Sequence, residues 1–402
     1  MSRTSLFRWM IAPACAFALL LPAARATAIE RVILDVDMGV VNDDAVTLFM
    51  LLNSPGVEVL GVTVVPGNTW MENGTAYALR QLELIGRTDV PVFMGVREPL
   101  MGSRQAWLEA EERLWGRSEY LGAYARQRPE SYLKLDRDPP IGYPTTKPAE
   151  EHAIDFIVRA VKAHPNQVTL FVLGPATNVA LAVRKNPEIV PLVKGVYYMG
   201  GSVDVPGNTS PAAEFNWWFD PEAVRITLRT PFRAQVVVPT DIAEKVYYTK
   251  AEYDRIASAP ETPITKLFKQ IQGPRFEKDP KARSHVWDAL TTAIFLKPSL
   301  ATRLDDRFLD PDRAAHLQTL VDLTRWCLPQ VFFYGMFVLL GQVLNARGRF
   351  GPMMWAPIAN NVISVPVYLL ALSLAGLRYD PRVPVFATLL ASAEYVGVVW
   401  FA

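Results

Sequence analysis

Short apolar segments alternate with amphipathic segments from about residue 30 to residue 300. The apolar segments are rich in Val and Leu, as buried strands are: RVILDV, VEVLGVTVV, VPVFMG, VTLFVLG, VKGVYYMGG and AQVVVPTD. Helical stretches lie between them, among them ENGTAYALRQLELIG, AIDFIVRAVKAH and TNVALAVRKNP. This alternation predicts an α/β domain with an open, mostly parallel sheet flanked by helices on both faces. Polar clusters follow the strands, at the edge where such sheets bind ligands.

Three segments depart from this alternation and divide the chain. Residues 1–28 combine a basic start, a short apolar stretch and small-x-small sites, which predict a signal peptide. Residues 100–150 are charged, proline-rich and aromatic, which predicts an irregular insertion, or lid, over the site. Residues 306–402 hold three apolar stretches, each near the ~20 residues that a bilayer crossing needs. Residues 29–305 remain as the α/β domain.

The two ends together predict an exported domain, attached to the cytoplasmic membrane by about three C-terminal transmembrane helices. Buried core helices are the alternative for these apolar stretches. The only cysteines are Cys15 and Cys327, so the exported domain must be stabilised by its core, by a bound metal or by both. A net charge of +1 gives no general electrostatic case for binding nucleic acid.

Four carboxylates follow the first predicted strand within ten residues: Asp35, Asp37, Asp43 and Asp44. Helix capping explains one or two of them, because Asp is a favoured N-cap residue. Four acids that converge at the edge of a buried sheet raise one another's pKa and destabilise the fold unless a cation binds. An all-oxygen site without Cys or His favours Ca²⁺ or Mg²⁺ over Zn²⁺. The stretch therefore predicts a metal site.

The same letters occur in another class of enzyme. Haloacid-dehalogenase-type phosphatases carry Asp-x-Asp after their first strand, but this chain offers neither their downstream acidic pair nor a convincing phosphate-binding Lys. Instead the chain resembles the inosine–uridine-preferring nucleoside hydrolases from about Arg31 to Leu300. Seven motifs in order carry the resemblance: DVDMGVVNDDA, VPGN, LGPATNVALA, MGG, VPGNTSPAAEFNWWFDPEA, PTDIAEK and WDALTTAIFLKP.

This resemblance implies hydrolysis of the N-glycosidic bond of ribonucleosides, with Ca²⁺ at the bottom of a ribose pocket. It assigns the ion to Asp37, Asp44, the backbone carbonyl of Thr177, and Asp288. Asp37 would also deprotonate the attacking water. The substrate-binding residues implied are Asp43, Asn68, Met199, Asn208, Glu214 and Asn216. These residue types suit the chemistry independently, because cleavage develops positive charge on the ribose and carboxylates or amide oxygens stabilise it.

The chain departs from the family's pattern beside the last metal ligand. The best-known members carry a His there as an acid for the leaving base, whereas this chain carries Trp287. Aromatic stacking is another way to activate the base, so Trp287 becomes the catalytic candidate. Trp70, Tyr247 and Tyr248 are further candidates for contacts around the base, and His285 is a weaker candidate for the acid.

A second departure follows residue 305, where the hydrolase fold should finish. Residues 308–402 instead resemble lipid II flippases of the mouse virulence factor family, through LPQVFFYG, LNARGRF and PMMWAPIANNV. We therefore interpret the chain as a hydrolase domain, truncated at its C-terminal end, joined to a flippase-like fragment.

Three functions remain open at this stage. The first is a ribonucleoside hydrolase, compatible with a homo-oligomer of the domain. The second is a membrane-tethered domain that binds nucleoside or ribose with little catalysis. The third is a lipid-carrier transport fragment whose soluble half is incidental. Intact Asp37, Asp43, Asp44 and Asp288 favour the first over the second.

Overall fold

The central sheet has six parallel strands in the order β3-β2-β1-β4-β5-β6. The computed structural model describes residues 29–115, 120–210, 213–307 and 309. The strands are β1 (Glu30–Val36), β2 (Val57–Val64), β3 (Val92–Met94), β4 (Val168–Val172), β5 (Val193–Met199) and β6 (Gln235–Val238). Each coincides to within one residue at its start with, or lies inside, one of the six apolar segments that predicted strands, so the α/β class with a parallel sheet is confirmed.

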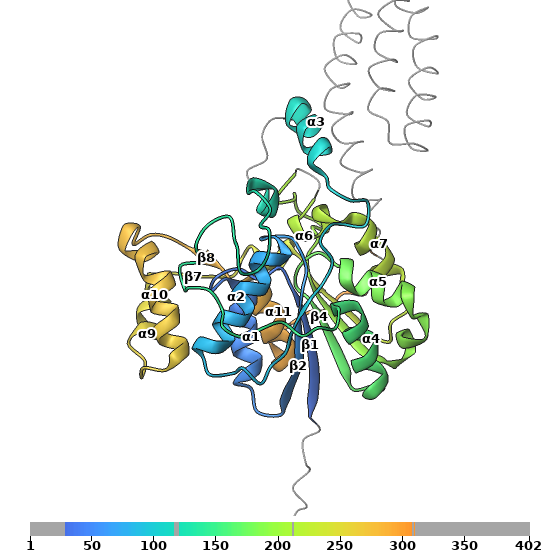
Figure 1. The fold of residues 1–402 in the computed structure, drawn as a ribbon, viewed down its shortest axis with the longest axis horizontal. Coiled ribbons are helices and arrows are strands. Elements are labelled where there is room, and N and C mark those ends of the chain that lie inside the picture. The colour runs from blue at the N-terminus through green and yellow to red at the C-terminus, as the bar shows by residue number, and fades with distance from the viewer. Residues whose placement is uncertain (1–28, 116–119, 211–212, 308, 310–402) are drawn as a thin grey trace, which may run out of the picture.

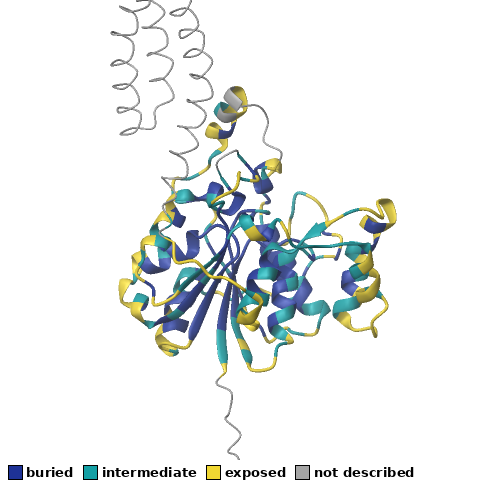
Figure 2. Ribbon diagram, turned by 180° about the vertical axis from the view of Figure 1, so that it is seen from behind, coloured by how far each residue is buried: buried dark blue, intermediate teal, exposed yellow. Residues whose placement is uncertain are grey.

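Helices cover both faces of this sheet, as predicted (Figure 1). On one face lie α1 (Asp43–Leu52), α2 (Met71–Leu84) and α11 (Trp287–Leu296), and α10 (Pro263–Lys278) packs against α2 at the outer side of this layer. On the other face lie α4 (Ala153–Ala163), α5 (Thr177–Lys185) and α7 (Pro221–Arg229). Successive strand residues point to opposite faces. Leu34 of β1 accordingly packs in the first core and Ile33 in the second, and Figure 2 shows the strands buried between the two layers.

The remaining elements include two longer helices, α3 (Gln105–Trp115) and α9 (Lys250–Ala257). The others are short: η1 (Gly122–Ala125), η2 (Pro187–Leu192), α6 (Phe215–Phe219), α8 (Thr240–Ala243), β7 (Tyr247–Tyr248), β8 (Ser284–His285) and η3 (Pro298–Leu300). Strands β7 and β8 pair antiparallel in a second, two-stranded sheet.

The strand order fixes where a ligand can bind. The chain runs outward from β1 through β2 to β3, and then returns to β4 on the other side of β1. Open α/β sheets bind ligands outside the carboxyl ends of the strands at such a reversal. The loops after β1, β2 and β4 meet at this point, and they carry the acidic and glycine-rich motifs.

The insertion at residues 100–150 is more ordered than the sequence predicted. It contains helix α3 and the 3-10 turn η1, and both contribute to a third, smaller core. Its charged composition concealed this, because its buried apolar residues are few and scattered: Leu108, Ala123 and Tyr124 join the smaller core, whereas Ile141 packs in the first core beside the sheet. A lid role for the segment stays a prediction.

The predicted signal peptide and the predicted transmembrane stretches lie outside the described residues. In the ranges that the structure describes, no helix combines the length and the apolar character that a membrane crossing requires.

Candidate functional site

Carboxylates from two neighbouring helices meet at the strand-order reversal. Asp43 and Asp44 open α1, and Asp288 lies in the first turn of α11. Each of the three offers an oxygen within 4.8 Å of the others. Helix capping does not explain Asp43 or Asp44, because Asn42 is the N-cap and its side-chain oxygen accepts from the Ala45 N–H at 3.3 Å.

The electrostatics of this cluster fit a hard cation. Burial raises the pKa of Asp44 and of Asp288 well above the ordinary value, and the neighbouring carboxylates raise both further. The Oδ1 of Asp44 is buried without a hydrogen-bond partner. Among the residues that the structure describes, no Lys or Arg forms an ion pair with these acids. Ca²⁺ or Mg²⁺ would neutralise these buried carboxylates, which no basic side chain of the described residues compensates.

Asp37 lies directly after β1 and is fully buried beside this cluster. Its two oxygens accept from Asn68, one from the backbone N–H at 2.7 Å and one from Nδ2 at 3.0 Å. Burial raises the pKa of Asp37 to about 7, although the Asn68 backbone bond opposes the shift. Gly67 allows this close approach, since a Cβ there would lie 2.0 Å from Asp37 Oδ2.

Asp35 does not join the cluster, so the prediction of four converging acids is wrong at this residue. The Asp35 carboxylate accepts from the Thr63 hydroxyl at 2.7 Å and from Asn178 Nδ2 at 2.8 Å. It therefore ties together β1, β2 and α5. Asp288 takes the fourth place, from a helix far along the chain.

Three predicted sugar-binding residues meet at the ends of β4 and β5. Glu214 is the N-cap of α6 and accepts from the N–H groups of Asn216 and Gly201, both at 2.9 Å. Burial raises the pKa of Glu214 to about 7. Asn216 Nδ2 donates to the Leu173 carbonyl at 2.9 Å and to the Met199 carbonyl at 3.2 Å. Their side chains are thus fixed at the base of the site.

The side chains of Asn208 and Thr177 form hydrogen bonds away from the acid cluster. Asn208 is exposed, and its Oδ1 accepts from the Phe215 N–H at 2.9 Å, which links its loop to α6. Thr177 is buried at the start of α5, and its hydroxyl donates to Asp220 at 2.6 Å. Asp220 also caps α7, because its side chain accepts from the Ala223 N–H. Carbonyl ligation by Thr177 stays a prediction.

Trp287 stands beside Asp288 at the start of α11, half-buried, with its Nε1 lacking a partner among the described residues. Its ring stacks on His285, with centroids 5.1 Å apart. Tyr247 meets His285 edge-on at 5.9 Å. Tyr247 and His285 of the two-stranded sheet and Trp287 of α11 thus form one aromatic cluster next to the acids, which is where a leaving base would need them.

Two other aromatic candidates have packing roles. Trp70 lies in the smaller core, and its Nε1 donates to the Arg126 carbonyl at 3.2 Å. Tyr248 lies 5.9 Å from Phe268 and 5.7 Å from Phe276, ring to ring. The prediction that they contact the base receives no support from these surroundings.

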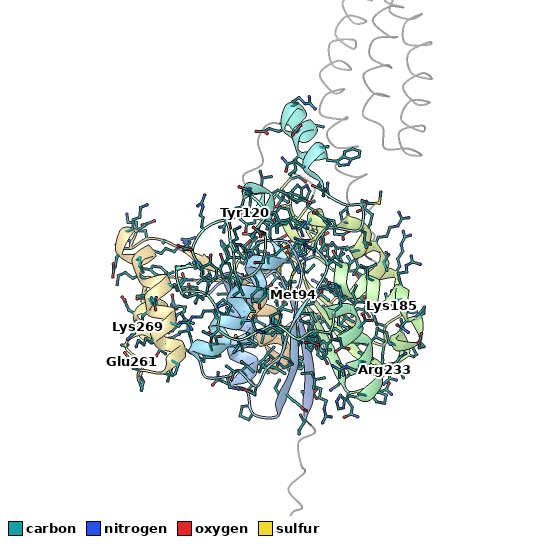
Figure 3. The ribbon with its side chains drawn as sticks, viewed as in Figure 1. Met94, Tyr120, Lys185, Arg233, Glu261 and Lys269 are labelled. Carbon is teal, nitrogen blue, oxygen red and sulfur yellow. The ribbon has the colours of Figure 1, made fainter. Side chains whose placement is uncertain are left out.

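One residue of the site was missed from the sequence. The Tyr120 hydroxyl donates to Asn68 Oδ1 at 2.6 Å, and its ring meets Phe215 edge-on at 4.8 Å. Figure 3 shows Tyr120 at the carboxyl end of the sheet. Nothing local marks this tyrosine, because the insertion holds several others.

Comparisons with known proteins identify relatives of this chain. The profile described as inosine-uridine preferring nucleoside hydrolase matches residues 32–326, and that of the lipid II flippase MurJ matches residues 286–399. The chain is 31% identical to the pyrimidine-specific ribonucleoside hydrolase RihA of an Enterobacter species, over 68% of this chain and 81% of that protein. It is 34% identical to the probable uridine nucleosidase 2 of Arabidopsis thaliana, over 57% of this chain and 65% of that protein.

A solved plant nucleoside hydrolase superposes with a TM-score of 0.55 at 28% identity, covering 68% of this chain and 80% of that one. The chain spans between 52% and 67% of the length of the fission-yeast and plant relatives that it matches. These relatives favour a hydrolase over the binding-domain and transport-fragment alternatives.

Proposed function

The chain belongs to the inosine-uridine preferring nucleoside hydrolase family, and from this premise we propose that residues 29–305 hydrolyse ribonucleosides to free base and ribose. The observation that carries the proposal is the buried acid cluster. Asp43, Asp44 and Asp288 converge at the reversal of strand order, with Asp37 beside them. Carboxylates placed so close together lower the stability of the fold, and such clusters occur at functional sites, where the chemistry requires them.

The family is generally metal-dependent, and the cluster fits a cation. We assign Ca²⁺ to Asp37, Asp44, the Thr177 carbonyl and Asp288, and a ribose hydroxyl to Asp43. When bound, the ion would supply a water of lowered pKa. Asp37 accepts the proton of the attacking water, in an orientation that the two hydrogen bonds from Asn68 fix.

The sugar is bound by Asn68, Asn208, Glu214 and Asn216, with Met199 at the floor. The Glu214 carboxylate and the amide oxygens stabilise the positive charge that develops on the ribose as the bond breaks. Because these side chains are already hydrogen-bonded in place, little reorganisation is needed when the charge appears. Trp287 contacts the leaving base from the start of α11 and promotes its departure by stacking.

The test uses the purified full chain and measures free ribose released from inosine or uridine. Asp37→Ala should lower kcat by at least ~10²-fold, as the loss of a base and metal ligand requires. Asp155→Ala is the matched control, because Asp155 pairs with Lys185 on the surface. Full activity of Asp37→Ala, or of the wild type in exhaustive chelator, would refute the mechanism.

We propose in addition that residues 1–28 direct export and that residues 306–402 attach the domain to the cytoplasmic membrane. The composition of both segments supports this, as does the flippase profile match over residues 286–399. A homo-oligomer of the hydrolase domain stays a prediction.

A further inference from the structure

We propose that Tyr120 is a positioning residue of the hydrolase site and acts through Asn68. The inference rests on the proposed function, because it concerns the same site. It starts from an unbroken chain of hydrogen bonds. Tyr120 donates to Asn68 Oδ1 at 2.6 Å, and Asn68 Nδ2 donates to Asp37 Oδ1 at 3.0 Å.

The insertion that carries Tyr120 is docked firmly on the loop of Asn68. The Ala123 N–H of η1 donates to the Gly67 carbonyl at 2.8 Å. Gly122 has φ +54°, and a Cβ there would lie 2.4 Å from the Gly67 oxygen and 2.4 Å from the Phe215 ring. Only glycine fits so close a contact at that φ. The turn after Tyr120 is therefore locked between the loop after β2 and the entry to α6.

Side chains of the smaller core reinforce this docking. It joins the insertion to the Asn68 loop and to α6, and its buried members are Trp70, Leu108, Ala123, Tyr124, Phe215, Trp218 and Phe219. The Tyr120 ring packs on Phe215. In the sequence, Phe215 stands between the predicted sugar ligands Glu214 and Asn216. Tyr120 thus bridges the two sides of the proposed ribose site.

The hydrogen bonds fix which way the Asn68 amide points. An Asn side chain can exchange its oxygen and nitrogen by a half-turn. With the oxygen toward Asp37, two acceptors would face each other. With Nδ2 toward Asp37, as observed, the oxygen faces Tyr120 and needs a donor, which the hydroxyl provides. The second lone pair of that oxygen stays available for a ribose hydroxyl.

Tyr120→Phe removes the hydroxyl and keeps the ring against Phe215. Without the donor, the Asn68 amide is less restrained toward both Asp37 and the sugar. We expect kcat/KM for uridine to fall about tenfold, which corresponds to the loss of roughly one hydrogen bond. Tyr143→Phe is the matched control, because the Tyr143 hydroxyl accepts from the Leu135 N–H at 3.3 Å within the same insertion. Its kcat/KM should equal that of the wild type.

A double-mutant cycle shows whether Tyr120 acts through Asn68. The full chain is prepared as wild type, Tyr120→Phe, Asn68→Ala and the double variant, and kcat, KM and the Kd for uridine are measured. The double variant should match Asn68→Ala alone, since the hydroxyl then has no amide to orient. A role in packing alone would instead give effects that multiply.

The outcomes separate this inference from the function on which it rests. A wild type that cleaves or binds uridine, with no effect of Tyr120→Phe or with effects that multiply in the double variant, overturns the inference alone. If uridine binds without being cleaved, the same cycle is judged on Kd. A wild type that neither cleaves nor binds inosine or uridine overturns both the inference and the proposed function, and if only inosine is a substrate the same cycle is run with inosine.

Discussion

Single residues at this site are arranged for function at a cost to stability. Asp44 and Asp288 are buried beside like charges, where the pKa of each carboxyl is raised. Asp35, two residues before Asp37, is buried too, but Thr63 and Asn178 donate to it. The same residue type is therefore a structural link at one position and part of a charged cluster at the next.

Removing one charge from the cluster separates the repulsion among the carboxylates from the stabilisation that a bound cation gives. In chelator, Asp288→Asn should raise Tm above that of the wild type, because repulsion among buried carboxylates is relieved. The wild type should gain stability with Ca²⁺, about 2.7 kcal/mol at 100 times Kd, whereas the variant should gain little. Scanning calorimetry with Ca²⁺, Mg²⁺ or chelator measures both. Asp254→Asn, which affects a surface pair with Lys250, should behave as the wild type.

Trp287 lends itself to a test with two leaving groups. Trp287→Ala should lower the turnover of inosine or uridine more than that of a nitrophenyl riboside. A nitrophenolate leaves without help, so the loss of stacking on the base is masked with that substrate. Trp107→Ala, which alters an exposed side chain of α3, is the control and should leave both rates unchanged. Equal losses with both substrates would assign Trp287 to packing.

At the scale of elements, the sequence predicts those that are buried on both sides. The six strands are near-continuous apolar runs, because helices cover both faces of the sheet, and such runs are recognisable without any partner. The acidic loop and Asp288 could be assigned from motifs. Tyr120 could not, because its role depends on a fold of the insertion that local composition hides. The N-cap at Asn42 was missed because the acids that follow it are equally good capping residues.

The end of the insertion is fastened by one carboxylate. Glu83, in the last turn of α2, accepts from the N–H groups of Thr145 at 2.7 Å and Thr146 at 2.6 Å, and from Arg80 at 2.9 Å. Burial raises the pKa of Glu83, but these hydrogen bonds outweigh it and lower the pKa from 4.5 to about 2. The ionised form therefore stabilises the folded chain.

Glu83→Gln should lower stability at pH 7 by roughly 1.5–3 kcal/mol, the range for hydrogen bonds to a charged group. A folded-state pKa below the unfolded value gives stability that is complete above pH 4.5 and is lost toward pH 2. The difference in unfolding free energy between wild type and variant should thus shrink across that interval, as denaturant titrations would show. Glu130→Gln changes an exposed pair with Lys134 in the same insertion and is the matched control, which should leave the unfolding free energy at pH 7 close to that of the wild type. A difference independent of pH would contradict this role of the carboxylate.

At the scale of the whole molecule, two family profiles overlap over residues 286–326. The structure assigns the first part of the overlap to the hydrolase domain. Phe295 of α11 packs edge-on against Phe171 of β4 at 5.0 Å and against Tyr197 of β5 at 5.3 Å. Helix α11 also brings Asp288 to the acid cluster. The boundary between the two parts therefore lies beyond α11, and a domain end near residue 305 stays a prediction.

Export of this domain would fix the orientation of everything that follows. If residues 29–305 lie outside, the first apolar stretch returns the chain inward and places Arg347 and Arg349 in the cytoplasm, as the positive-inside rule prefers. Arg378 and Arg382 would then lie outside, against that rule, so the charges alone do not decide and the signal peptide does.

Protease added to intact spheroplasts should therefore digest the hydrolase domain and spare a small membrane fragment. About three spans place the C-terminus inside, so an epitope there should survive on that fragment. A cytoplasmic marker protein must stay intact as the control for lysis. Gln330, Asn360, Asn361 and Glu394 lie within the predicted spans, where polar groups are costly unless they face other helices. The fragment should accordingly be short-lived without another membrane protein beside it. A hydrolase domain that resists the protease would show that the export signal or the topology is wrong.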